Sequence, residues 1–213
     1  MNHHNLWIDG QWKKSDNKYP IISPYSGKEV ALTDYASADD IESAFNSARD
    51  AVIPFKKTSR YLRSKLLKTI ADEIGKHRKE FIDLIVSEVG KPCSLADVEV
   101  TRAIGVFSIA SEEARRYSGE IFPLDIDVGG RAFEEAITFF HPRGVALGIT
   151  PFNFPLNLVA HKVAPALAIG APIVLKPAPA APGASNLLAK IFEKSSRASA
   201  SPKNQPKGPY KFC

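Results

Sequence analysis

The feature that most constrains this 213-residue sequence lies between residues 145 and 176. There a short apolar run is followed by a loop, a longer apolar run and a second short apolar run. Residues 145–149 and 172–176 are short and apolar, which is typical of buried strands. Residues 155–169 are long enough for a helix, and another helix is expected at residues 182–193. The order strand, helix, strand indicates a βαβ unit with parallel strands. The sequence therefore predicts an α/β fold containing part of a doubly wound, Rossmann-like parallel sheet.

The preceding 120 residues predict a hairpin and four helices. Asp9 and Gly10 lie between apolar residues, which is typical of a tight hairpin turn. Ser37 and Asp40 resemble a capping box, and apolar residues then recur at helical spacing until Pro54, where we expect the first helix to break. Gly residues and the Lys-Pro pair before residue 93 suggest the later boundaries. The further helices are expected at residues 60–77, around residues 81–90, and at residues 95–117.

Residues 121–143 change from helical spacing to short extended segments around Gly129 and Gly130, with residues 136–140 expected as a strand. This pattern predicts a two-stranded β-arm. Its apolar residues have no helical face to cover, so we expect a second copy of the chain to bury them. The sequence thus predicts a homo-oligomer that forms through this arm.

From Ser195 onward the chain is rich in Ser, Pro and Lys, and too poor in apolar residues to offset the entropy of ordering. We therefore expect residues 195–213 to be disordered. A frameshifted reading of a longer gene is our hypothesis for their origin, since the helix before them lacks a normal end. The expected organisation is an amino-terminal part (1–120), the arm (121–143), the βαβ part (144–194) and the tail (195–213).

Charge and composition exclude several classes of protein. The net charge is +5, but four of the cations lie in the tail, which has no acidic residue, so the body is nearly neutral. A nucleic-acid partner is therefore not expected, because it would need clustered cations on the folded surface. No apolar run is long enough to span a membrane. With only Cys93 and Cys213 and no metal-ligand spacing, we expect a cytoplasmic protein without a metal site.

The loop that follows residues 145–149 is the best candidate for a site, because ligands of doubly wound sheets bind where the strands end. Asn153 lies in this loop and has two interpretations. Its side chain can cap the next helix, since Asn is a favoured N-cap residue. Alternatively, its amide can donate a hydrogen bond to a developing oxyanion. The local pattern alone leaves both interpretations open.

A longer series of motifs resembles one family. The series contains Thr-Pro-Phe-Asn-Phe-Pro-Leu at residues 150–156, Lys162 with Ala-Pro-Ala-Leu-Ala at residues 164–168, and Ile-Val-Leu-Lys-Pro-Ala at residues 173–178. It also includes Glu-Val-Gly-Lys-Pro at residues 88–92 and extends back to the hairpin. In order and spacing these motifs are similar to the aldehyde dehydrogenase superfamily, over about nine-tenths of the chain.

This resemblance implies an enzyme that oxidises an aldehyde to a carboxylic acid with NAD or NADP, through a cysteine thiolate and a glutamate base. Asn153 then corresponds to the amide that stabilises the oxyanion. Lys176 corresponds to the lysine that contacts the adenosine ribose, although a lone lysine at a strand end is more often a solvated residue. The cofactor-binding residues that the resemblance implies are Ile149, Thr150, Pro151, Phe152, Asn153, Lys176, Ala178 and Pro179.

Two departures from the family pattern bear on activity. Many NAD-preferring relatives carry a glutamate three residues after the lysine, where this chain has Pro179, so the choice between NAD and NADP stays open. The family's glycine-rich phosphate loop, its catalytic glutamate and its cysteine have no counterpart in this sequence, and neither Cys93 nor Cys213 is expected to replace the cysteine. We therefore expect this chain alone to be inactive. The alternative is a non-catalytic module for dinucleotide binding or oligomerisation.

Overall fold

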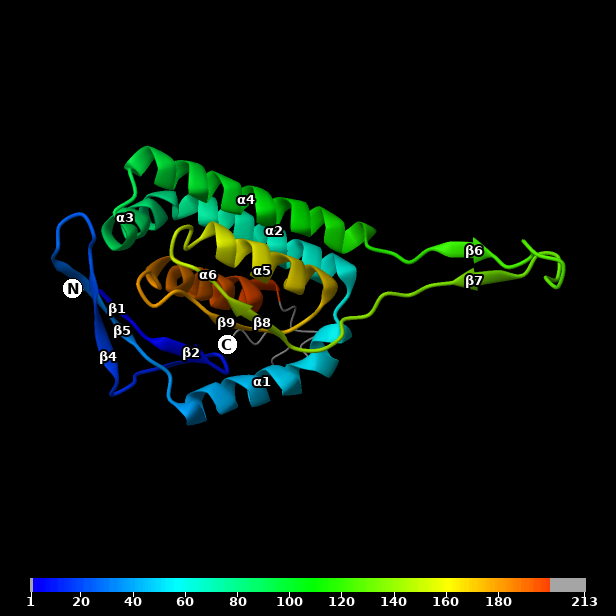
Figure 1. Ribbon diagram of the computed structural model, residues 1–213, viewed down its shortest axis with the longest axis horizontal. Coiled ribbons are helices and arrows are strands. Elements are labelled where there is room, and N and C mark those ends of the chain that lie inside the picture. The colour runs from blue at the N-terminus through cyan, green and yellow to red at the C-terminus, as the bar shows by residue number, and fades with distance from the viewer. Residues whose placement is uncertain (1, 200–213) are drawn as a thin grey trace.

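The computed structural model describes residues 2–199, and it confirms the α/β architecture. Figure 1 shows a layer of helices beside a small parallel sheet, and a long arm that projects away from this body. The strands are β1 (Asn2–His4), β2 (Leu6–Ile8), β3 (Gln11–Lys13), β4 (Lys18–Ile22), β5 (Glu29–Asp34), β6 (Ile121–Pro123), β7 (Glu135–Ile137), β8 (Ala146–Ile149) and β9 (Ile173–Lys176). The helices are α1 (Ala38–Lys56), α2 (Arg60–Lys76), α3 (Arg78–Val89), α4 (Cys93–Arg116), α5 (Asn157–Ile169) and α6 (Gly183–Ser199).

The hairpin predicted around Asp9 and Gly10 is confirmed. Strands β2 and β3 pair antiparallel with Trp7 opposite Trp12. Asp9 has φ 53° and Gly10 has φ 73°, so both central residues adopt the positive φ that a tight type I′ turn requires. The right-handed twist of the two strands matches such a turn, which explains why the two short strands pair in this register.

A three-stranded sheet at the amino terminus was not predicted. Strand β5 lies between β1, which runs parallel to it, and β4, which runs antiparallel. In β4 only one residue, Ile21, is buried, so the sequence shows no clear alternation of apolar and polar residues. Short strands of this kind give little periodic signal, and tertiary pairing decides their structure.

The first residues of the chain are attached to its last described helix, α6. Trp12 Nε1 donates a hydrogen bond to Glu193 Oε2 at 3.0 Å, and Asn186 Nδ2 donates to the main-chain oxygen of Asn5 at 2.8 Å. The Trp7 ring also meets the Phe192 ring edge-on, with 5.9 Å between centroids. The amino-terminal hairpin therefore depends on α6 for its position.

Helix α1 begins with the capping box expected from the sequence. Ser37 Oγ accepts from the main-chain nitrogen of Asp40 at 3.1 Å, and Asp40 Oδ2 accepts from that of Ser37 at 2.9 Å. The expectation that Pro54 breaks this helix was wrong, because α1 continues to Lys56. The proline removes one main-chain hydrogen bond from the last turn, and the burial of Phe55 holds that turn on the core.

One hydrophobic core joins the helical layer to the sheet. Helix α2 packs against α4, α5 and α6, and α4 also packs against α3 and α5. The helical spacing of the second helix predicts an inward face, and of its residues Leu62 is half-buried, whereas the others are buried, namely Leu66, Leu67, Ile70 and Ile74. The largest fully buried side chains are Phe55, Phe81, Phe107, Phe192, Leu66, Leu67, Ile70, Ile74, Ile85, Leu156, Ile173 and Leu188.

The βαβ unit is confirmed, with β8 and β9 paired in parallel. Helix α5 contacts both strands, while α1 packs its Ala44 and Ala48 against Val174 of β9. The expectation that β8 is buried was wrong in part, since Leu147 is 56% and Ile149 57% exposed. In the described part of the chain this sheet has two strands, and α1 covers only a portion of the face on which these side chains lie.

The arm consists of β6 and β7, which pair antiparallel with Ile121 opposite Ile137. Strand β7 is shorter than expected and ends at Ile137, because the chain beyond Thr138 leaves the ladder. Figure 1 shows the arm extending well beyond the helices. Its exposed large apolar residues are Ile121, Phe122, Leu124, Ile126, Val128, Phe133, Ile137, Phe139 and Phe140.

Helix α6 is longer than the sequence indicated. It continues to Ser199, so the expectation of disorder from Ser195 onward was wrong for residues 195–199. Ser195 is only 2% exposed, because it lies on the same helix face as the buried Leu188 and Phe192. Tertiary packing thus orders a segment whose composition is typical of disorder. Cys213, most of the predicted tail and the frameshift hypothesis lie outside the described residues.

Within residues 2–199, none of the helices combines the length and the hydrophobicity that crossing a membrane requires. The same residues contain no group of three or more His, Cys, Asp or Glu side chains that could bind a metal ion.

Candidate functional site

The carboxyl ends of β8 and β9 lie side by side, as the βαβ prediction required. Ile149 is paired with Lys176, and the next main-chain nitrogen, that of Thr150, donates to the oxygen of Lys176 at 3.2 Å. The loops that follow the two strands, residues 150–156 and 177–182, therefore leave the sheet at the same edge. Two parts of the sequence that were predicted to bind one ligand are brought together there.

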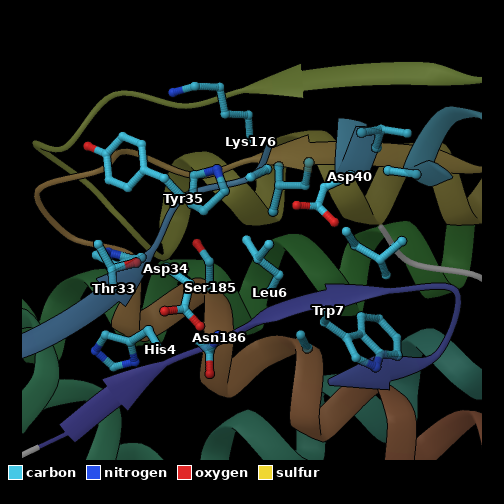
Figure 2. Close-up of a pocket in the computed structure, with 18 of the residues that line it drawn as sticks. His4, Leu6, Trp7, Thr33, Asp34, Tyr35, Asp40, Lys176, Ser185 and Asn186 are labelled. Carbon is cyan, nitrogen blue, oxygen red and sulfur yellow. The ribbon is translucent and has the colours of Figure 1, made fainter. Parts of the chain in front are cut away.

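A cavity of about 420 Å³ adjoins this edge. Its walls come from β1, β2, β5, β8, β9, α1 and α6. Figure 2 shows Lys176 on one side and the polar residues His4, Asp34, Ser185 and Asn186 on another. The size and the mostly apolar lining are typical of small-molecule sites. Four of the predicted cofactor-binding residues line it: Ile149, Lys176, Ala178 and Pro179.

Several buried polar atoms near this edge have unused hydrogen-bonding capacity. Within the described chain, Asp34 Oδ2, Ser185 Oγ and Thr150 Oγ1 are buried and have no hydrogen-bond partner. Asp34 and Ser185 line the cavity, whereas Thr150 follows β8 directly. Buried polar atoms are usually satisfied by protein, water or ligand. An apolar cavity with a lysine at its rim and unsatisfied polar atoms is consistent with part of a nucleotide site.

Pro151, Phe152 and Asn153 are exposed and do not line the cavity. The interpretation of Asn153 as a helix cap is wrong, because the N-cap residue of α5 is Leu156. That N-cap residue makes no side-chain hydrogen bond to the helix. In the described structure the Asn153 side chain has no hydrogen-bond partner, so its amide is free to donate to a ligand at the strand ends. The oxyanion role of Asn153 stays a prediction.

The start of α5 is held by two residues that the sequence analysis did not identify as part of the site. Glu99, in α4, is fully buried and its Oε1 accepts from the main-chain nitrogens of Leu156 at 2.9 Å and Asn157 at 3.2 Å. Lys91 forms an ion pair with Glu99 and donates to the main-chain oxygen of Asn153 at 2.8 Å. Only the Gly-Lys-Pro motif around Lys91 offered a signal, and nothing in its spacing pointed to Asn153.

A similar arrangement holds the start of α6. Glu88, at the end of α3, is buried and its Oε2 accepts from the main-chain nitrogen of Gly183 at 2.9 Å. The other carboxylate oxygen lies 2.7 Å from His4 Nε2. At the start of each helix that follows a strand of the βαβ unit, main-chain N–H groups therefore donate to a buried glutamate of the helical layer. A negative charge at a helix amino terminus is favourable because the first N–H groups point toward it.

Cys93 is exposed and is the first residue of α4. It lies two residues after Lys91, which contacts the Asn153 loop, although about 60 residues of sequence separate the two segments. The start of α4 therefore lies near this edge of the sheet, although it is distant in sequence. No observation in the described structure assigns Cys93 a role there.

Comparison with known proteins agrees with this geometry. The aldehyde dehydrogenase family profile matches residues 12–202. Among curated enzymes, 3-sulfolactaldehyde dehydrogenase of Priestia aryabhattai is 37% identical over 194 residues, which cover 91% of this chain and 40% of that enzyme. The chain thus spans about two-fifths of the length of the relatives it matches.

Solved structures match the fold over nearly the whole chain. Aldehyde dehydrogenase 21 from Physcomitrella patens, in complex with the reaction product succinate, superposes with a TM-score of 0.89 and 32% identity, covering 99% of this chain and 42% of that one. NADP-dependent glyceraldehyde-3-phosphate dehydrogenase from Bacillus halodurans C-125, complexed with NADP, gives 0.88 and 29% identity, covering 100% and 43%. The match in sequence motifs, fold and family profile shows that this chain belongs to the aldehyde dehydrogenase family.

Proposed function

We propose that this chain forms part of an enzyme that oxidises a small aldehyde to a carboxylic acid with NAD or NADP. The observation that carries the proposal is the pairing of Ile149 with Lys176, because it brings the Asn153 loop and the Lys176 loop to one edge of the parallel sheet. Ligands of this class of sheet bind at that edge. The relatives are aldehyde dehydrogenases, and one solved neighbour is complexed with NADP.

In this proposal Asn153 stabilises negative charge on the substrate. When a thiolate adds to the carbonyl carbon of an aldehyde, the carbonyl oxygen becomes an oxyanion, and a preorganised amide N–H lowers its energy. A bound NAD or NADP would supply the hydride acceptor for this oxidation. The Asn153 side chain suits the role of donor, since it is exposed at the strand ends and no described residue occupies its amide.

Lys176 would contact the ribose of the adenosine half, with Ala178 and Pro179 beside it on the cavity wall. Ile149, Thr150, Pro151 and Phe152 would lie toward the nicotinamide half. Pro179 supplies neither a carboxylate that would repel a 2′-phosphate nor a cation that would bind one. We therefore propose binding of either NAD or NADP, in a cytoplasmic setting, without a preference set by this position.

We also propose that the 213-residue chain does not turn over aldehydes by itself. The covalent mechanism needs a thiolate, a base and the cofactor together in one crevice. Cys93 is exposed at the start of α4 and lies outside the sequence setting in which the family carries its nucleophile. The test is reduction of NAD or NADP followed at 340 nm with short aldehydes, and reproducible aldehyde-dependent reduction would contradict this part of the proposal.

Dinucleotide binding tests the site itself. We expect weak binding in the millimolar range, about −4 kcal/mol, because part of the pyrophosphate site is not supplied by the described residues. Lys176→Ala should weaken the binding at least fivefold in a titration followed by NMR, while Lys65→Ala, an exposed lysine on α2, should leave it unchanged. Equal affinity in Lys176→Ala and the parent chain would contradict the site.

The exposed arm favours one alternative function. A non-catalytic module that assembles through residues 121–143 would need a large apolar surface away from the body, and the arm provides one. A monodisperse oligomer that binds neither dinucleotide would support this alternative over the enzymatic one.

A further inference from the structure

The Asn153 loop is held from outside the βαβ unit. Helix α5 has no side-chain cap of its own, and its first two available N–H groups, those of Leu156 and Asn157, both donate to Glu99 Oε1. Glu99 lies in the amino-terminal half of α4 and has no exposed surface. The carboxylate thus fixes the carboxyl end of the loop against the helical layer.

The second oxygen of the same carboxylate extends this link to Asn153. Glu99 Oε2 pairs with Lys91 Nζ, and Lys91 Nζ donates to the Asn153 main-chain oxygen at 2.8 Å. The ammonium also lies 4.0 Å from the centre of the Phe154 ring, within the range of a cation–π interaction. Lys91 is 11% exposed as a side chain, so solvent screens this set of contacts only weakly.

We propose that Glu99 and Lys91 are positioning residues for the Asn153 amide. The inference rests on the proposed role of Asn153 as oxyanion donor. Because the carboxylate holds the main chain at residues 156 and 157, and the ammonium holds it at residue 153, the segment between them is clamped at both ends. A donor that is fixed before the reaction needs no reorganisation when charge develops, which is the condition for strong oxyanion stabilisation.

The simplest competing explanation is that Glu99 only caps α5 and that Lys91 only balances its buried charge. Glu99→Gln separates the two explanations. The amide oxygen of glutamine can still accept from residues 156 and 157, so the cap survives. The amide nitrogen cannot accept from Lys91, so Lys91 loses the carboxylate that holds its ammonium against the Asn153 main-chain oxygen. The helix cap and the loop clamp therefore respond differently to this one substitution.

The test measures backbone order by ¹⁵N relaxation in the 213-residue chain, without substrate or cofactor. We expect the order parameter of Asn153 and Phe154 to fall from about 0.8 to below about 0.6 in Glu99→Gln and in Lys91→Met. Lys91→Arg keeps a cation that can bridge the same groups, and should keep the order parameter near that of the parent chain. Hydrogen exchange at Leu156 and Asn157 should change less than about threefold in Glu99→Gln, because their acceptor remains.

Glu88→Gln is the matched control, since it makes the same change at the buried glutamate that caps α6. It should leave the Asn153 loop unchanged. Unchanged order at Asn153 in both Glu99→Gln and Lys91→Met would overturn the proposal. So would loss of exchange protection at Leu156 and Asn157 in Glu99→Gln with an intact loop in Lys91→Met. Failure of dinucleotide binding would contradict the proposed function and leave this result in place.

Discussion

His4 Nε2 lies 2.7 Å from Oε1 of Glu88, and both side chains are almost completely buried. The pair joins β1 to the end of α3, 84 residues later in the chain. Because the other oxygen of Glu88 accepts from Gly183, the same carboxylate connects the amino-terminal sheet, the helical layer and the start of α6. A single buried side chain thus joins three segments that are distant in sequence.

Gly183→Ala should destabilise the protein, because a Cβ at this position would overlap the Glu88 carboxylate. Overpacking of this kind costs about 1–3 kcal/mol. In the interior of an ordinary helix, a change from Gly to Ala stabilises the folded protein by up to about 1 kcal/mol. Gly105→Ala is the control, since its Cβ would meet no atom within 4 Å. Urea denaturation measures both variants. A stabilised Gly183→Ala would show that Glu88 moves away without cost.

Asp40 should contribute a pH-dependent part of the stability. The hydrogen bond from Lys13, followed by those from Ser37, lowers the pKa of this carboxyl to about 2. A depressed pKa in the folded state adds stability that is complete above the unfolded pKa, near 4, and is lost as the pH falls through about 2. Lys13 is 59% exposed, so screening limits the contribution to at most about 2 kcal/mol.

Asp40→Asn therefore should unfold more easily than the parent chain at pH 7, and the difference should shrink as the pH falls from about 4 to about 2. Denaturant midpoints across this range measure the effect. A difference that grows toward low pH would have the wrong sign for this explanation.

Ser195→Ala should stabilise the protein by about 1 kcal/mol. The hydroxyl of Ser195 is buried and has no hydrogen-bond partner within the described chain, so its removal relieves a desolvation cost. Ser196→Ala is the adjacent control, because the Ser196 hydroxyl is partly exposed and donates to the main-chain oxygen of Glu193 at 2.9 Å. The midpoints of urea denaturation, compared at a constant m value, measure the change in stability of both variants. A destabilised Ser195→Ala would mean that a water or another group satisfies the hydroxyl.

We predict that the chain self-associates through the arm, so removal of the arm should abolish this association while leaving the body folded. Glu120 and Thr138 face each other at the base, where the nitrogen of Thr138 donates to the oxygen of Glu120 at 2.9 Å. Residues 121–137 can therefore be replaced by an Asn-Gly turn. Light scattering should show a smaller particle, and the thermal midpoint should move by less than about 4 °C. The control Ile53→Ser changes an exposed apolar residue on α1 and should not alter the particle size.

Local patterns predicted the parts of the fold that local interactions determine. The turn at Asp9 and Gly10, the cap at Ser37 and the order of strand and helix from β8 to β9 each depend on residues close in sequence. The helical segment at residues 195–199 was missed because its Ser-rich composition indicates disorder, whereas packing of Ser195 against the core orders it.

The candidate site was predicted only in part for the same reason. Asn153 and Lys176 lie in motifs that follow the strands, so the topology of the sheet placed them at one edge. Glu99 lies 57 residues from Leu156, and Lys91 lies 62 from Asn153. A single sequence has no periodic or capping signal that links residues at such separations. The structure was therefore needed to exclude the helix-cap role of Asn153, and its oxyanion role stays a prediction.

The attachment of Trp12 to Glu193 and of Asn5 to Asn186 bears on how the chain folds during synthesis. Each hydrogen bond joins residues 181 positions apart. At about 5–20 residues per second, the ribosome needs on the order of 10–40 s to make α6 after the amino-terminal hairpin has emerged. During this interval Trp7 and Trp12 lack the helix that buries them, and an isolated two-stranded hairpin is marginally stable in water. The nascent hairpin should therefore be a site at which chaperones that recognise exposed aromatic residues bind.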